Sequence, residues 1–192
     1  SKREDKVKFY TGLYHALLGR GLANDVNGAY PRNDGSVGQL PMKEGKPQYN
    51  VYNTDAAWGA QWNLSQLWTL AYPEYMSEYV SSHIQAYKDA GWLADGLANN
   101  RYVSGVGTNL LSTIIAGAYQ CGIRDFDTKL AYEACLKNEL DGKDRPFGAG
   151  KVNTAEFVKY GYVPHQDQGE GYHEPSCSRL HTLWNILTVH GP

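Results

Sequence analysis

Apolar residues recur with a helical period through much of this chain, and the clearest pattern spans residues 52–87. Two apolar stripes with spacings of three and four residues lie there on either side of Pro73. Proline cannot continue a helix but suits the first turn of the next one, so the segment predicts two helices joined by a short turn. The first helix carries Trp58, Trp62 and Trp68, which either pack in a core or floor a sugar site.

Further helices are expected at about 4–18, at about 108–120, after Asp127 as N-cap, in a short stretch capped by Thr154, and from Ser178. The second helix of the central pair should end near residue 90, with Gly91 as its C-cap. The first helix has an apolar stripe that we expect to be buried: Val7, Tyr10, Leu13, Tyr14 and Leu17.

Long turn-rich segments separate these helices, at 22–51, after Gly91 and at 141–151. No strand of ordinary length is convincing, although 22–51 could hold one short hairpin. The pattern therefore predicts an all-α fold of stacked αα-hairpins.

Composition narrows the function only slightly. A net charge of -2 over 192 residues gives no electrostatic reason to expect nucleic acid or an anionic membrane as partner, and no apolar run approaches the roughly 18 residues of a membrane span. The chain has 15 Tyr and 5 Trp but only 4 Phe. Rings that carry a polar group suit carbohydrate and protein interfaces, although they also occur in helix–helix cores.

Three cysteines, Cys121, Cys135 and Cys177, lack metal-type spacing. Cys121 and Cys135 fall on apolar helical faces, where we expect small buried thiols. A group of polar residues near the C-terminus also lacks a known ligand spacing: His165, Asp167, Glu170, His173 and Glu174. The sequence contains no phosphate-binding glycine loop after a strand, no nucleophile elbow and no HExxH motif.

Six segments are distributed over almost the whole chain: FYTGLYHALL at 9–18, DVNGAY at 25–30, LWTLAYPE at 67–74, GWLADGLANN at 91–100, GIRDFDTKLAYEACLKN at 122–138 and YGYVPHQ at 160–166. Together they resemble family 92 glycoside hydrolases, the calcium-dependent exo-acting α-mannosidases, and they keep the order and nearly the spacing of that family.

The resemblance implies a catalytic (α/α)6 toroid beside a β-sandwich domain. Residues 1–192 would form a partial toroid domain, the N-terminal half, of an α-1,2-mannosidase-like enzyme that acts on α-mannose-containing glycans. The full-length protein would use calcium, with none expected in this segment, and would be secreted or periplasmic. Its partners would be the glycan, the remaining half of the toroid and the β-sandwich. The apolar faces of a half toroid would favour self-association.

One motif departs from the family. Where the family has W-D-T-F-R-A, with an Asp and an Arg at the sugar pocket, this chain has WGAQWN, so Gly59 replaces the Asp and Trp62 the Arg. The family's general acid, its base and most calcium ligands align beyond Pro192. We therefore expect the segment to be inactive alone. The alternative is a non-catalytic relative that binds glycan or serves as a scaffold.

The candidate substrate-binding residues are Trp58, Trp62, Asp25, Asp55, Glu174 and Arg179. Each also has a structural interpretation. The two tryptophans could pack against a neighbouring hairpin, and Asp25, like Asp34, could stabilise a turn. Asp55 could be a helix N-cap. Glu174 is a weak candidate for a catalytic acid, because HEPSCSR resembles the family's E-S-V-S-R turn, but it could equally pair with Arg179 or sit at a helix start.

Overall fold

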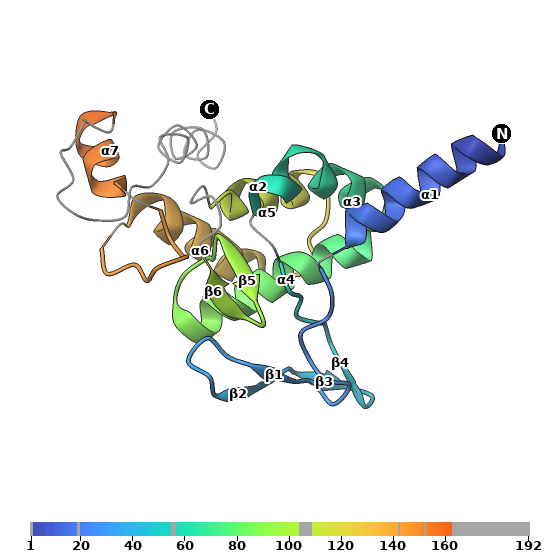
Figure 1. The fold of residues 1–192 in the computed structure, drawn as a ribbon. Coiled ribbons are helices and arrows are strands. Elements are labelled where there is room, and N and C mark those ends of the chain that lie inside the picture. Colours follow the sequence, from blue (N-terminus) through green and yellow to red (C-terminus); the bar gives the residue numbers. More distant parts are fainter. Residues whose placement is uncertain are drawn as a thin grey trace.

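Helices make up most of the structure, a computed structural model that describes residues 2–18, 20–54, 57–103, 109–141, 143–151 and 153–162. The helical elements are α1 (Arg3–Leu17), α2 (Ala57–Gly59), the π-helical turn η1 (Ala60–Leu64), α3 (Ser65–Ala71), α4 (Pro73–Ala90), α5 (Leu111–Gln120), α6 (Thr128–Leu140) and α7 (Thr154–Tyr160). The long helix α4 lies in the middle, with α2, α3 and α5 above it in Figure 1 and the ribbons β1–β4 below it.

The expected all-α fold is correct for the core but incomplete, because the turn-rich segments form short antiparallel ribbons. The pairs are β1 (Ala29–Pro31) with β2 (Val37–Gln39), β3 (Met42–Lys43) with β4 (Lys46–Pro47), and β5 (Gly96–Ala98) with β6 (Arg101–Val103). Strands of two or three residues are too short to show the alternating pattern by which a strand is recognised. Only one such hairpin was expected, and only in segment 22–51.

Polar side chains attach the first two ribbons to α4. The Tyr30 hydroxyl donates to the Asp89 carboxylate at 2.8 Å, and the Tyr49 hydroxyl donates to the Gln85 side chain at 2.7 Å. Burial and the neighbouring Asp89 raise the pKa of Tyr30 to about 12. These hydrogen bonds hold the ribbons on the side of α4 that faces away from α2, α3 and α5 (Figure 1).

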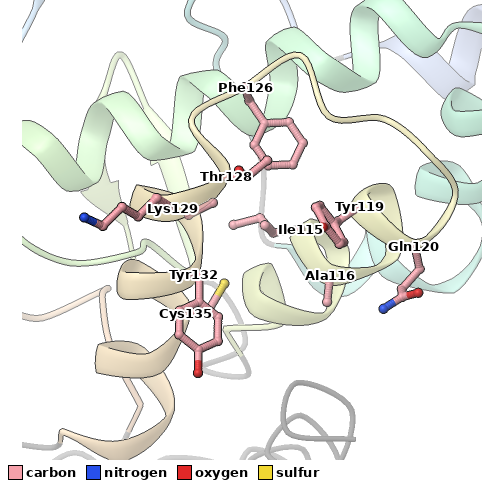
Figure 2. Close-up of a pocket in the computed structure, with 10 residues that line it drawn as sticks. Ile115, Ala116, Tyr119, Gln120, Phe126, Thr128, Lys129, Tyr132 and Cys135 are labelled. Carbon is pink, nitrogen blue, oxygen red and sulfur yellow. The ribbon is translucent and has the colours of Figure 1, made fainter.

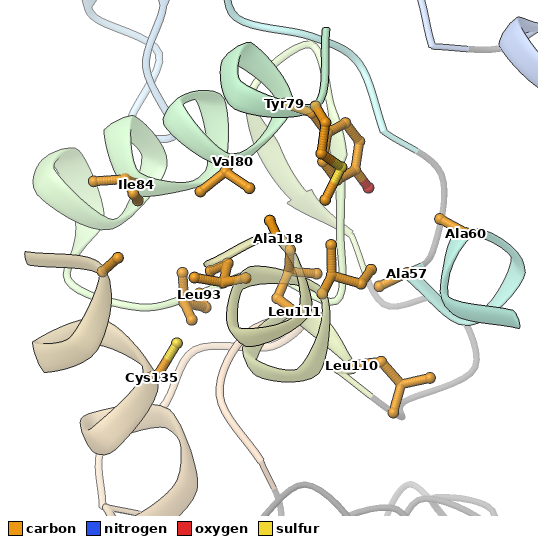
Figure 3. Packing of buried hydrophobic residues seen from close by; sticks show 14 of the residues in the cluster. Ala57, Ala60, Tyr79, Val80, Ile84, Leu93, Leu110, Leu111, Ala118 and Cys135 are labelled. Atoms are coloured by element: carbon orange, nitrogen blue, oxygen red, sulfur yellow. The ribbon is translucent and has the colours of Figure 1, made fainter. Parts of the chain in front are cut away.

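The main core lies where α4, α5 and α6 meet the helix of α2, η1 and α3 (Figure 3). Met76, Tyr79 and Val80 from α4 are fully buried against Leu111 and Ile114 from α5. The apolar face expected for the helix at 108–120 is thus confirmed. The apolar residues of this face, Leu111, Ile114, Ile115 and Ala118, recur at intervals of three and four residues, which is the spacing of one helical face.

Two of the predicted helix ends are confirmed by their geometry. Gly91 ends α4 in the left-handed conformation with φ +80°, and its N–H donates to the Tyr87 carbonyl at 2.7 Å. Asp127 caps α6, since its carboxylate accepts from the Leu130 N–H at 3.0 Å. The prediction for Thr154 is wrong: it is the first residue of α7, and its hydroxyl donates to the Lys151 carbonyl at 3.0 Å.

The apolar stripe of α1 is exposed, contrary to expectation. Tyr10 and Tyr14 are 64% and 63% exposed, and Ala16 is the one buried residue of this helix. Figure 1 shows the reason: α1 extends away from the other helices, so the described part of the chain offers its apolar face no partner. The apolar pattern of this helix therefore did not predict burial.

Cysteine burial follows expectation at one position and not at another. Cys135 is buried in α6, whereas Cys121 is exposed just after the end of α5. Cys177 lies outside the described residues. Within the described part of the chain, no helix is both long enough and apolar enough to span a membrane.

Candidate functional site

Trp58 and Trp62 lie on a helix that is not regular. It begins as α2, widens into the π-helical turn η1 and continues as α3. The Ser65 N–H donates to the Ala60 carbonyl five residues earlier. Isolated turns of this kind are rare and are frequently found at functional sites.

The two tryptophan rings form an exposed aromatic corner. Their centroids are 5.2 Å apart and their planes meet at 80°, an edge-to-face arrangement. Trp58 is half-buried and packs against the main core, whereas Trp62 is 58% exposed. Between them in sequence, Gly59 is exposed, and a Cβ placed on it would meet no atom within 4 Å. The exposed ring of Trp62 therefore lies three residues from a position that has room for a side chain.

Trp68 has a different role from the other two. It is completely buried and contacts the rings of Tyr75 and Tyr79 at centroid distances of 5.2 and 5.1 Å. Trp68 therefore packs in the core, which was one of the two interpretations of the three tryptophans. The exposed ring of Trp62 keeps the sugar-stacking one open.

The other predicted site residues do not join this corner in the described structure. Asp25 is exposed in the segment before β1, where its N–H donates to the Ala29 carbonyl at 2.8 Å. In Figure 1 that segment and the ribbons lie across α4 from α2. Asp55, Glu174 and Arg179 lie outside the described residues.

The turn interpretation is confirmed for Asp34. Its carboxylate accepts from the Ser36 N–H at 2.9 Å and from the Ser36 hydroxyl at 2.7 Å. These two hydrogen bonds lower the pKa of Asp34 below its ordinary value.

A buried polar cluster was not predicted. Asn109 lies at its centre: its N–H donates to Asp95 at 2.9 Å, and its side-chain amide donates to the carbonyls of Leu93 and Gly150 at 2.9 and 3.0 Å. Glu139 is buried nearby and accepts a hydrogen bond from Lys151 at 2.7 Å. The sequence contained a signal for its burial, because Glu139 follows Ala131 and Cys135 at intervals of four on the inner face of α6. The cluster joins chain segments that are far apart in sequence.

Burial controls the protonation of two groups in this region. It raises the pKa of the Cys135 thiol to about 12, so this thiol stays protonated at neutral pH and is a poor nucleophile. Burial also lowers the pKa of Lys151, and the adjacent Glu139 opposes that shift. Both observations indicate a structural role for the cluster.

A separate groove of about 390 Å³ lies between α5 and α6 (Figure 2). Aromatic rings from both helices and the intervening loop border it: Tyr119, Phe126 and Tyr132. Ile115, Ala131 and Cys135 also line it. None of the candidate site residues predicted from the sequence lines this groove.

Structure comparison defines the class of fold. The chain is similar to the family 92 α-mannosidase of Bacteroides thetaiotaomicron solved with mannoimidazole, with a TM-score of 0.76 and 18% identity over 94% of this chain and 22% of that one. It is also similar to the family 92 inverting mannosidase of the same bacterium, with a TM-score of 0.67 and 24% identity over 83% of this chain and 21% of that one. The chain thus has the helical fold of one part of these structures and spans less than a quarter of their length.

The sequence itself defines the family. The model of the glycosyl hydrolase family 92 catalytic domain matches residues 1–182. The chain therefore belongs to this family, as its motifs indicated. No curated protein matches the chain.

Proposed function

We propose that the parent protein is a glycoside hydrolase that cleaves α-mannosidic bonds, with α-1,2-linked mannose in glycans as its substrate. Residues 1–192 would form part of its catalytic (α/α)6 domain, the N-terminal half. The observation that carries the proposal is the family match over residues 1–182. The mannosidase names of both structural relatives support the same substrate class.

The chain alone is expected to hydrolyse no mannoside. An inverting glycosidase needs two carboxyl groups roughly 6.5–9.5 Å apart, and the resemblance puts the family's acid and base beyond Pro192. Calcium belongs to the proposal for the full-length protein only. Among the described residues, no three His, Cys, Asp or Glu side chains gather where they could hold a metal ion.

An activity assay tests this expectation. The 192-residue chain is incubated with aryl α-mannosides and α-1,2-mannobiose, with and without added calcium, beside a full-length family member as positive control. Turnover that disappears in Glu174→Gln would contradict the proposal, because it would make Glu174 a catalytic acid within this segment.

The aromatic corner of Trp58 and Trp62 is proposed as a sugar-stacking surface of the parent protein. Its support is the exposed Trp62 ring, held edge-to-face against Trp58 beside the open position of Gly59. A flat apolar ring with one N–H donor can stack on the apolar face of a hexose and bond one hydroxyl group.

Tryptophan fluorescence of the chain during titration with methyl α-mannoside and α-1,2-mannobiose tests the corner. Trp62→Ala should abolish the response. Leu70→Ala is the matched control, since Leu70 is an exposed apolar residue of α3 that lies outside the corner. Equal binding by both variants would exclude stacking at Trp62.

The alternative function is a non-catalytic relative that binds glycan or serves as a scaffold, favoured by Gly59 and Trp62 at positions where the family has an Asp and an Arg. A lost charged hydrogen bond costs roughly 1.5–3 kcal/mol. We therefore propose that the full-length protein favours stacking over polar capture of a terminal mannose. Restoring both residues with Gly59→Asp and Trp62→Arg should change its mannose affinity, whereas an unchanged affinity would place the motif outside the sugar pocket.

The compartment and the partners of the parent protein are proposals from the family as well. We propose a secreted or periplasmic protein in which the remaining half of the toroid and a β-sandwich domain accompany this segment. Purification of the full-length protein from cell fractions tests the compartment, and its domain composition tests the partners.

A further inference from the structure

The wide turn η1 leaves one backbone carbonyl without its ordinary partner. In a regular α-helix the Gln61 carbonyl would accept from the Ser65 N–H, four residues later. Here that N–H donates to the Ala60 carbonyl instead. A backbone carbonyl is a strong acceptor, so the Gln61 carbonyl is available to another donor.

The side chain of Gln66 supplies that donor. Its Nε2 donates to the Gln61 carbonyl at 3.1 Å. Its Oε1 accepts from the Ser65 hydroxyl at 3.2 Å. The Gln66 side chain is thus bonded to Gln61 near the start of η1 and to Ser65 directly after its end.

The turn also sets which residues face the core. Ala57 before it and Ala60 at its start are buried, and so are Ser65 and Trp68 after it. Each residue of an α-helix turns the chain by about 100°, so in a regular helix Ser65 would lie about 80° from Ala57 and about 140° from Ala60. The wide turn rotates each residue by less and so brings Ser65 towards the face of Ala57 and Ala60, while Trp62 stays exposed.

We propose that Gln66 is a positioning residue for the aromatic corner: it holds the wide turn and thereby fixes the angle between the rings of Trp58 and Trp62. Trp62 lies inside the turn, one residue after the carbonyl that Gln66 binds. The role in sugar binding rests on the proposed function of the corner, whereas the role in ring geometry does not.

Circular dichroism reports this geometry directly. Two indole rings in edge-to-face contact couple their electronic transitions and give an exciton couplet, and Trp62→Phe establishes which part of the signal the pair contributes. Gln66→Ala and Gln66→Glu both remove the amide donor, whereas Gln66→Lys keeps a donor on a long side chain. Gln120→Ala, an exposed glutamine at the end of α5, is the matched control.

We expect the couplet to shrink in Gln66→Ala and Gln66→Glu, and to persist in Gln66→Lys and Gln120→Ala. Affinity for methyl α-mannoside should fall about fivefold in the first two variants, the loss typical of one net hydrogen bond. A couplet of wild-type amplitude in Gln66→Ala and Gln66→Glu overturns the inference. A smaller couplet with unchanged sugar affinity supports the role of Gln66 in ring geometry and overturns its role in sugar binding. If the wild-type chain binds no mannoside while the couplet responds to Gln66, the role of Gln66 in ring geometry is supported and the proposed sugar site fails.

Discussion

The ammonium group of Lys151 lies 2.7 Å from the carboxylate of Glu139, and both side chains are almost completely shielded from solvent. Glu139 lies near the end of α6, whereas Lys151 belongs to the segment that precedes α7. The second carboxylate oxygen of Glu139 has no hydrogen-bond partner among the described residues. Removal of either charge would leave the other one buried and uncompensated.

Lys151→Met should therefore lower the free energy of unfolding by about 3–5 kcal/mol. The double variant Lys151→Met with Glu139→Met should lose much less, because it leaves no unpaired charge. Urea denaturation at pH 7 measures both, with Lys88→Met on the exposed side of α4 as control. An equally large loss in the single and double variants would mean that packing, rather than the charge pair, stabilises this site.

His83 provides a second buried group with a measurable consequence. Its ring is completely shielded from solvent and contacts Tyr79 edge-to-face at 4.9 Å. Neither ring nitrogen has a hydrogen-bond partner among the described residues. Burial lowers the pKa of His83 from 6.5 to about 3.

Between these two pKa values the unfolded chain binds the proton and the folded chain does not, so stability rises with pH. The contribution is complete above about pH 6.5 and is lost as the pH falls towards 3. From pH 7.5 to pH 5, His83 should reduce the free energy of unfolding by about 2 kcal/mol.

His83→Leu should remove that part of the pH dependence, and at pH 7 it should be close to neutral because an apolar side chain replaces unpaired polar atoms. Denaturation curves at pH 5 and pH 7.5 give the comparison. His15→Leu on the exposed face of α1 serves as control and should keep the wild-type pH dependence. If the free energy of unfolding of His83→Leu changes with pH as much as that of the wild type, the pKa of His83 is the same in the folded and unfolded chains, which contradicts the prediction.

The helix ends could be predicted from residues that lie close together in the sequence. Asp127 and Gly91 mark helix ends through chemistry that acts within one turn, and both were predicted. The π-helical turn η1 was not, because one extra residue barely alters a pattern of apolar positions over so short a helix.

Long-range relationships could not be predicted from residue patterns. The cluster around Asn109 depends on several segments that meet only in the folded chain. The stripe of α1 shows the same limit, since a pattern identifies an apolar face but not what covers it. Of the six candidate substrate-binding residues, the structure describes three and brings together Trp58 and Trp62. The roles of all six stay predictions.

The tryptophans of one helix should differ sharply in their effect on stability. Trp68→Ala should cost about 3–5 kcal/mol, because it removes a completely buried aromatic side chain. Trp62→Ala should cost about 1 kcal/mol or less, since it removes an exposed ring and one aromatic contact. Chemical denaturation of both variants gives the two values. Similar losses would show that Trp62 is part of the core.

The exposed stripe of α1 should cause this chain to self-associate. Its exposed side chains include Val7, Tyr10, Tyr14 and Leu17, which together form an apolar surface on a helix that extends from the body. Surfaces of this kind bind other protein surfaces because association removes apolar area from water. We therefore expect dimers or larger species in sedimentation and light scattering as the protein concentration rises.

Charged substitutions on this stripe test the expectation. Tyr10→Lys with Tyr14→Lys should weaken association by about tenfold or more, because tyrosines are frequent energetic centres of interfaces and like charges repel. Val26→Lys is the matched control, since Val26 is 92% exposed but lies outside the stripe. A wild-type chain that stays monomeric at all concentrations would contradict the prediction. Equal weakening by the control would move the contact away from α1.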